Sequence, residues 1–87
     1  MEVKKEVVIG SVESNDILIK ISSGKGVVIN LQSSVIKQYG EDIRNTIRSV
    51  VDELGVSDVT IDASDKGALD FTIKARVKTA LKSACES

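Results

Sequence analysis

The most regular feature of the chain is a set of short segments in which hydrophobic and polar residues alternate. Alternation of this kind places hydrophobic side chains on one face of a β-strand and polar side chains on the other. In three segments every second residue is hydrophobic, and a less regular hydrophobic run precedes them; they cover residues 17–22, 27–32, 59–63 and 7–12. We expect four strands, each with one face turned to solvent.

The links between the first three strands are short and polar. Residues 13–15 connect the first two strands, and residues 22–26, which contain two glycines, connect the second to the third. Links of this length and composition are typical of β-hairpins. The pattern therefore predicts that the first three strands pair in sequence order as antiparallel hairpins.

From Val35 the hydrophobic period changes to the three- and four-residue steps of a helix. The predicted buried stripe consists of Ile36, Tyr39, Ile43, Ile47, Val50, Val51 and Leu54. Ser33 or Ser34 would supply the N-cap, and Gly55 would end the helix. Asp65 can cap a second helix, whose buried line would be Leu69, Ile73, Val77, Ala80, Leu81 and Ala84.

These elements predict an α+β fold with the order β-β-β-α-β-α. We expect a four-stranded, mostly antiparallel sheet with two helices packed on one face. The 87 residues would form a single domain, with frayed ends at residues 1–5 and at about residues 84–87.

The composition argues against catalysis by this chain. The sequence has no His and one Cys, and only 2% of its residues are aromatic. A Ser-His-Asp triad, a Cys-His dyad and a His-containing metal site all require an imidazole, so they are excluded, and no catalytic or metal-binding residue is expected. The net charge of −1 and the lack of a long apolar run argue against nucleic acid and membranes as partners and predict a cytoplasmic protein.

One hydroxyl has a favourable position for modification. Ser14 lies in the short link between the first two predicted strands, where a side chain points away from the sheet and another protein can approach it. With no imidazole to activate it, Ser14 would accept a group only from an enzyme that supplies the base. The alternative interpretation is an ordinary polar turn.

Three separated blocks resemble the acyl carrier proteins of citrate lyase, its small gamma subunits. They are Gly-Ser-Val-Glu-Ser-Asn-Asp at residues 10–16, Ser-Ser-Val with Lys-Gln-Tyr-Gly and Ile-Arg over residues 33–44, and Asp-Lys-Gly-Ala-Leu-Asp with Lys-Ala-Arg over residues 65–76. They occur in the order and at the spacing of the family. The resemblance spans roughly residues 9 to 82.

The resemblance implies a phosphoprotein that is a non-catalytic carrier in citrate fermentation. The serine of the Glu-Ser turn, here Ser14, would bear a 2'-(5''-phosphoribosyl)-3'-dephospho-coenzyme A arm through a phosphodiester. Acetyl and citryl groups on its thiol would pass between the alpha (acyl transferase) and beta (citryl lyase) subunits as citrate is cleaved to acetate and oxaloacetate. A prosthetic-group transferase and an acetylating ligase would be further partners.

Several alternatives stay open at this point. Ser11 provides a second hydroxyl close to Ser14, and the Asp65–Asp70 block can be either a helix start or a docking turn for a partner. The related carrier subunit of malonate decarboxylase uses the same type of arm, and a non-catalytic nucleic-acid or protein interaction module has a compatible order of elements. Glu13 and Asp16 flank Ser14, and their charges would repel the phosphates of an arm and direct it toward basic partners.

Overall fold

Four strands and two helices make up the structure, which is a computed structural model and describes residues 1–86. In chain order they are β1 (Val7–Gly10), β2 (Ile17–Ser22), β3 (Val27–Ser33), α1 (Ile36–Leu54), β4 (Val59–Asp65) and α2 (Asp70–Cys85). The predicted α+β class and the order β-β-β-α-β-α are confirmed. Each alternating segment is a strand because its hydrophobic positions face the helices and its polar positions face solvent.

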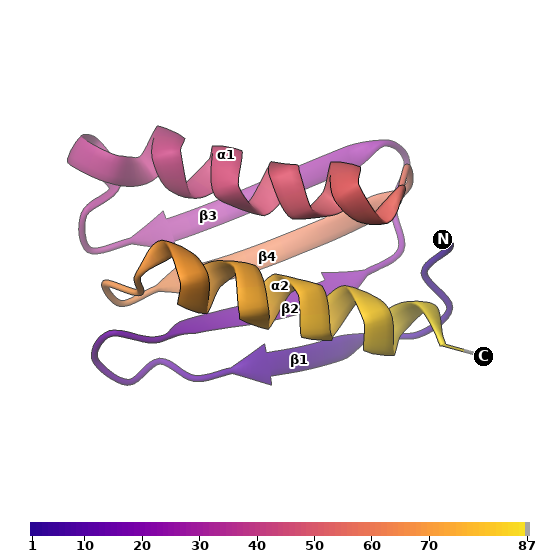
Figure 1. Cartoon of the computed structure of the whole chain (residues 1–87), viewed down its shortest axis with the longest axis horizontal. Helices are drawn as coiled ribbons and strands as arrows, with labels where there is room; N and C mark the ends of the chain where they lie inside the picture. The colour runs from indigo at the N-terminus through magenta and orange to yellow at the C-terminus, as the bar shows by residue number, and fades with distance from the viewer. Residues whose placement is uncertain (87) are drawn as a thin grey trace.

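Both helices cross the same face of the sheet, so the molecule has two layers (Figure 1). The core lies between the layers, where the alternate isoleucines Ile17, Ile19 and Ile21 of β2 are completely buried. The helices contribute the stripe residues Ile43, Ile47, Val50, Val51, Ile73, Val77, Ala80, Leu81 and Ala84 to the same core. This confirms the prediction that two helices cover one face.

The order of the strands in the sheet is β1-β2-β4-β3. β1 and β2 form the predicted antiparallel hairpin, but the predicted hairpin between β2 and β3 is wrong, because β4 lies between them. β3 runs parallel to β4, with Val27 beside Val59, since α1 forms a crossover connection between the two strands. The other two strand pairs are antiparallel, so the sheet is mostly antiparallel as predicted.

The end of α1 follows the prediction, but its beginning does not. Gly55 ends the helix in the left-handed conformation, with φ of 66°, which an L side chain adopts only with strain. The N-cap is Val35, and no side chain caps the helix. Ser33 instead accepts a hydrogen bond from the Val35 N–H at 3.1 Å, so neither Ser33 nor Ser34 is the cap.

α2 also starts later than predicted. Its N-cap is Leu69, while Asp65 is the last residue of β4, so the prediction that Asp65 caps this helix is wrong. Leu69 was expected in the buried line, but 61% of its surface is exposed. In α1, Ile36 and Tyr39 are likewise exposed rather than buried, because the first turns of α1 extend beyond the end of the sheet (Figure 1).

Backbone hydrogen bonds join the two ends of the chain, where the sequence predicts fraying. The N–H groups of Lys4 and Lys5 donate to the Ala84 carbonyl at 2.8 and 3.3 Å. Ala84 is fully buried, and α2 continues to Cys85. Residue 87, the last of the expected frayed residues, lies outside the described part of the chain.

Candidate functional site

The β1–β2 loop, residues 11–16, lies at the end of the sheet where the β4–α2 turn, residues 66–69, also lies (Figure 1). Two backbone hydrogen bonds join these segments. The Asn15 N–H donates to the Lys66 carbonyl at 2.8 Å, and the Lys66 N–H donates to the Asp16 carbonyl at 2.9 Å. The loop that contains Ser14 is therefore supported by a turn that lies far from it in the sequence.

Ser14 occupies the exposed tip of the β1–β2 loop. Asn15, which follows it, has φ of 65°, a left-handed conformation that asparagine tolerates better than most residues. Within residues 1–86, the Ser14 hydroxyl makes no hydrogen bond that meets normal distance and angle limits. Ser14 thus has an accessible hydroxyl on a loop with a fixed base.

The Ser11 hydroxyl is used in the structure of the loop itself. It donates to Oδ2 of Asp16 at 2.7 Å and accepts from the Glu13 N–H at 3.3 Å. The Ser11 side chain is also partly buried. A group attached to this oxygen would break the bond to Asp16, since the hydroxyl proton would be lost. Of the two candidate serines, Ser14 is the one whose modification leaves the loop intact.

Asp16 is the centre of a hydrogen-bond network that sequence reasoning missed. Its carboxylate accepts from Nε and Nη2 of Arg76 at 3.1 and 3.2 Å and from the Ile17 N–H at 2.8 Å. The Ser11 hydroxyl, the Ile17 N–H and Arg76, in that order, lower the pKa of Asp16 from 3.8 to about 2. No local sequence pattern connects Asp16 with Arg76, because 60 residues separate them.

This pairing changes the expected charge around Ser14. The prediction was that Glu13 and Asp16 together repel the phosphates of an arm. Arg76 compensates the charge of Asp16 directly, so that part of the prediction is wrong. Glu13 is exposed beside Ser14 and forms no ion pair with any residue in the described range 1–86.

Asp65 stabilises the β4–α2 turn from inside the fold. Only 1% of its surface is exposed. It accepts hydrogen bonds from the Ser33 hydroxyl at 2.8 Å, the Gly67 N–H at 3.2 Å and the Ala68 N–H at 3.0 Å. Asp65 therefore ties the end of β3 to the turn that supports the β1–β2 loop, which gives this member of the Asp65–Asp70 block a structural role.

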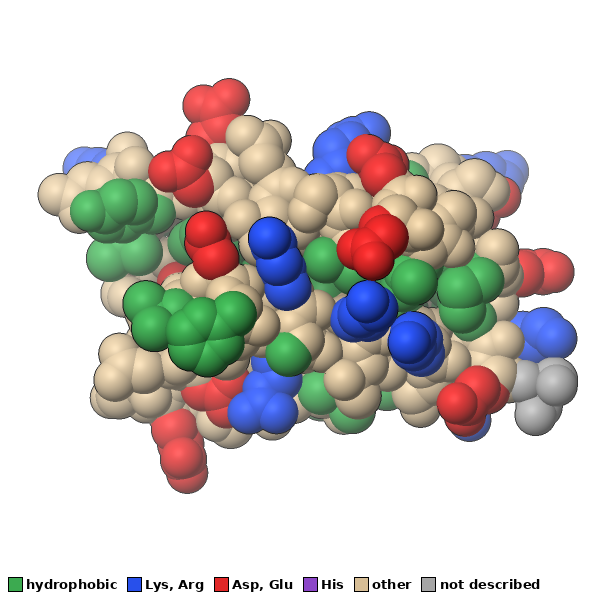
Figure 2. Space-filling model, viewed as in Figure 1, with side chains coloured by type: hydrophobic (Ala, Val, Ile, Leu, Met, Phe, Trp, Pro, Cys, Tyr) green, Lys and Arg blue, Asp and Glu red, His purple; other side chains and the backbone are tan. Residues whose placement is uncertain are grey.

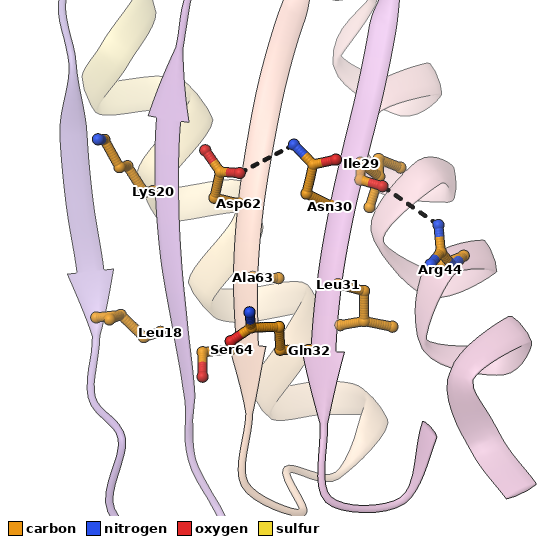
Figure 3. Close-up of a pocket in the computed structure, with 10 residues that line it drawn as sticks. All are labelled: Leu18, Lys20, Ile29, Asn30, Leu31, Gln32, Arg44, Asp62, Ala63 and Ser64. Atoms are coloured by element: carbon orange, nitrogen blue, oxygen red, sulfur yellow. Dashed lines mark hydrogen bonds between the residues drawn. The ribbon is translucent and has the colours of Figure 1, made fainter. Parts of the chain in front are cut away.

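Two hollows of the surface differ in character. The first, the α1–α2 groove, lies between the Tyr39–Ser49 part of α1 and the start of α2; it is about 960 Å³ in volume and is lined by Tyr39, Leu69 and Phe71, among others. The second, about 530 Å³, lies at β3 and on the uncovered sheet face, where polar side chains such as Asn30, Gln32 and Asp62 line it together with apolar ones (Figure 3). There Asn30 donates to Asp62, and Arg44 donates to the Ile29 carbonyl at the outer edge of β3, so these groups already have partners.

Cys85, the one cysteine of the chain, lines neither hollow. Residues 1–86 contain no cluster of three or more Cys, Asp or Glu side chains suited to a metal ion. Cys85 is partly buried at the opposite end of α2 from the β1–β2 loop, and desolvation raises the pKa of its thiol. Neither described helix has the length and apolar character that a membrane crossing requires.

Comparison with known proteins identifies the family. A family model described as the malonate decarboxylase delta subunit matches residues 4–84. The chain is 44% identical to the citrate lyase acyl carrier protein of Treponema denticola over 86 residues, which cover 99% of each chain. The chain belongs to the citrate lyase acyl carrier protein family. The acyl carrier role, and with it a covalently attached prosthetic group, follows from this membership.

Other relatives agree on the family, and one solved structure agrees on the fold. The citrate lyase acyl carrier proteins of Lacticaseibacillus casei and Streptococcus equi subsp. equi are 48% and 51% identical, over 100% and 93% of this chain and 87% and 81% of theirs. A chain of the Pseudomonas malonate decarboxylase hetero-tetramer in complex with malonate aligns with a TM-score of 0.80 at 20% identity, over 91% of this chain and 82% of that one. That chain therefore has the same fold, while the higher identities are to citrate lyase carriers.

Proposed function

We propose that this protein is the acyl carrier subunit of a citrate lyase and that Ser14 is the attachment residue. The observation that carries the proposal is the contrast between the two serines of the β1–β2 loop. The Ser14 hydroxyl is exposed and makes no hydrogen bond in the described chain, whereas the Ser11 hydroxyl is bound to Asp16. A modifying enzyme can reach Ser14 without disturbing the fold.

The prosthetic group that fits this residue is the phosphoribosyl dephospho-coenzyme A arm implied by the family resemblance. In the attachment step, the Ser14 Oγ forms a bond to the phosphorus next to the ribose of a triphosphoribosyl donor. The bond from this phosphorus to the other two phosphates breaks, and pyrophosphate leaves. The hydroxyl proton passes to a base of the prosthetic-group transferase, because this chain has no His that could supply an imidazole base. Once attached, the arm supplies the thiol that holds the acyl group.

The contribution of this chain is presentation of the attached group. The bonds of Asn15 and Asp16 to Lys66 and the ion pair of Asp16 with Arg76 fix the base of the loop. A flexible link on a fixed base gives the acyl group an effective concentration of order mM at sites within its reach. Acetyl and citryl groups would pass in this way between the transferase and lyase subunits, while the carrier itself makes and breaks no carbon-carbon bond.

The carrier subunit of malonate decarboxylase remains the second candidate, since its fold matches. The sequence identities of 44–51% to citrate lyase carriers favour the first. Reconstitution with citrate lyase alpha and beta subunits tests the choice, because only a citrate lyase carrier restores citrate cleavage.

Attachment is tested by co-expression with the prosthetic-group transferase and by the intact mass of the product. The wild type and Ser11→Ala are expected to gain the mass of one arm, and Ser14→Ala is expected to gain none. Modification of Ser14→Ala together with its loss in Ser11→Ala would assign the arm to Ser11 instead.

A further inference from the structure

The α1–α2 groove is apolar at its surface, next to the proposed attachment residue. Tyr39, Leu69 and Phe71 line it with 54%, 61% and 70% of their surfaces exposed. Tyr39 and Phe71 are the two aromatic residues of the whole chain. Figure 2 shows exposed hydrophobic side chains at the end of the molecule where both helices begin. Exposed hydrophobic residues gathered in this way mark interaction sites in soluble proteins.

The groove is adjacent to the β1–β2 loop. Gly67 lines the groove, and a side chain placed at this glycine would lie 3.7 Å from Oδ1 of Asn15. The backbone bond from Asn15 to Lys66 joins the same two segments. A protein that covers the exposed tip at Ser14 therefore reaches the rim of the groove as well.

We propose that the α1–α2 groove is the docking site for the enzyme that attaches the prosthetic group to Ser14. This inference rests on the proposed function. The attaching enzyme must bring its catalytic groups within bonding distance of the Ser14 Oγ, so its contact surface has to surround the β1–β2 loop. The acyl transferase and lyase subunits act on the far end of the arm, many bonds from Ser14, and need no contact at this place.

The chemistry of the groove also fits such an enzyme. A protein that binds a polyphosphate donor carries positive charge around its active site. Asp42 and Asp70 are exposed on the rim of the groove, Lys74 is the one cation among the described lining residues, and Glu13 is exposed beside Ser14. We therefore expect a partner face with an apolar protrusion for the groove and basic residues opposite these carboxylates.

The test is the rate of arm attachment by the purified transferase with its triphosphoribosyl donor. Phe71→Ser and Leu69→Ser are compared with the wild type and with Val8→Ser. Val8 is a matched control because 57% of its surface is exposed but it lies on the uncovered face of the sheet. All four proteins should fold, since each replaced side chain is largely exposed, and circular dichroism checks this.

We expect the groove variants to lose about tenfold or more in kcat/KM, mainly through a higher KM, which is the size of loss seen when one of the few residues that dominate an interface is truncated. Val8→Ser should match the wild type. Long incubation should still load the groove variants fully, and the loaded variants should restore citrate cleavage with alpha and beta subunits at the wild-type rate.

An unchanged attachment rate in both groove variants would overturn the docking proposal. If those variants also lost assembly or citrate cleavage, the groove would instead belong to the contact with the lyase subunits. Failure of the proposed function looks different, because the wild type itself would then gain no mass on Ser14.

Discussion

The buried carboxylate of Asp65 offers a sharp test of how the site is supported. Asp65→Ala removes the acceptor of three hydrogen bonds, from the Ser33 hydroxyl and the Gly67 and Ala68 amides. A buried donor left without a partner costs about 1–3 kcal/mol. We take about 1–1.5 kcal/mol for each donor, because the turn amides recover some contact with water, so the expected loss is about 3–5 kcal/mol.

This loss is large compared with the total stability of a small domain. A chain of 87 residues is expected to have a free energy of unfolding of about 4–13 kcal/mol. The assay is urea unfolding followed by circular dichroism. Asp62→Ala is the matched control, because Asp62 lies on the same strand but is exposed and accepts only one side-chain bond, from Asn30; its expected loss is about 1 kcal/mol or less.

The effect should also be visible at the β1–β2 loop. In Asp65→Ala, the amide hydrogens of Asn15 and Lys66 should exchange faster with solvent. Both of their hydrogen bonds involve Lys66, in the β4–α2 turn that Asp65 supports. A loss no larger than that of Asp62→Ala, with unchanged exchange at Asn15, would refute the reasoning that Asp65 supports the site.

Two further predictions concern the same loop. The folded-state pKa of Asp16, about 2, lies below its ordinary value of 3.8. Its hydrogen-bond network therefore stabilises the fold above about pH 4, and this stabilisation is lost as the pH falls toward 2. The difference in urea-unfolding midpoint between the wild type and Asp16→Asn should shrink over that range. A constant difference would contradict this prediction. Gly10 has φ of 97° and faces the Ile17 carbonyl, whereas Gly26 has φ of 70° and open space around it. In urea unfolding, Gly10→Ala should lower the free energy of unfolding by about 3 kcal/mol or more, and Gly26→Ala should lower it by about 1–2 kcal/mol. Equal losses in the two variants would contradict the contact at Gly10.

The residues that face the core could be predicted from the sequence, but the neighbours of each strand could not. Alternation at Ile17, Ile19 and Ile21 indicates which side of β2 is buried, yet it says nothing about the strand beside it. The insertion of β4 between β2 and β3 depends on the crossover through α1. The succession of β3, α1 and β4 along the chain is the sequence feature that indicates a parallel pair.

The candidate site shows the same division. Its exposed serine follows from a short polar link between two strands. The partners that hold the loop, Arg76 for Asp16 and Lys66 for Asn15, come from segments distant in sequence, which meet only after the sheet and helices pack. Asp65 has the sequence signature of a helix cap, and only the structure assigns its bonds to the turn and to Ser33.

The most direct test of the central claim is peptide mapping of the carrier isolated from its natural host in an active citrate-cleaving complex. Trypsin cuts after Lys5 and Lys20, so Ser11 and Ser14 lie on one peptide and fragment ions distinguish them. We predict that this peptide carries the full mass of the phosphoribosyl dephospho-coenzyme A arm and that the fragments place it on Ser14. An unmodified peptide from an active complex, or an arm on Ser11, would contradict the account.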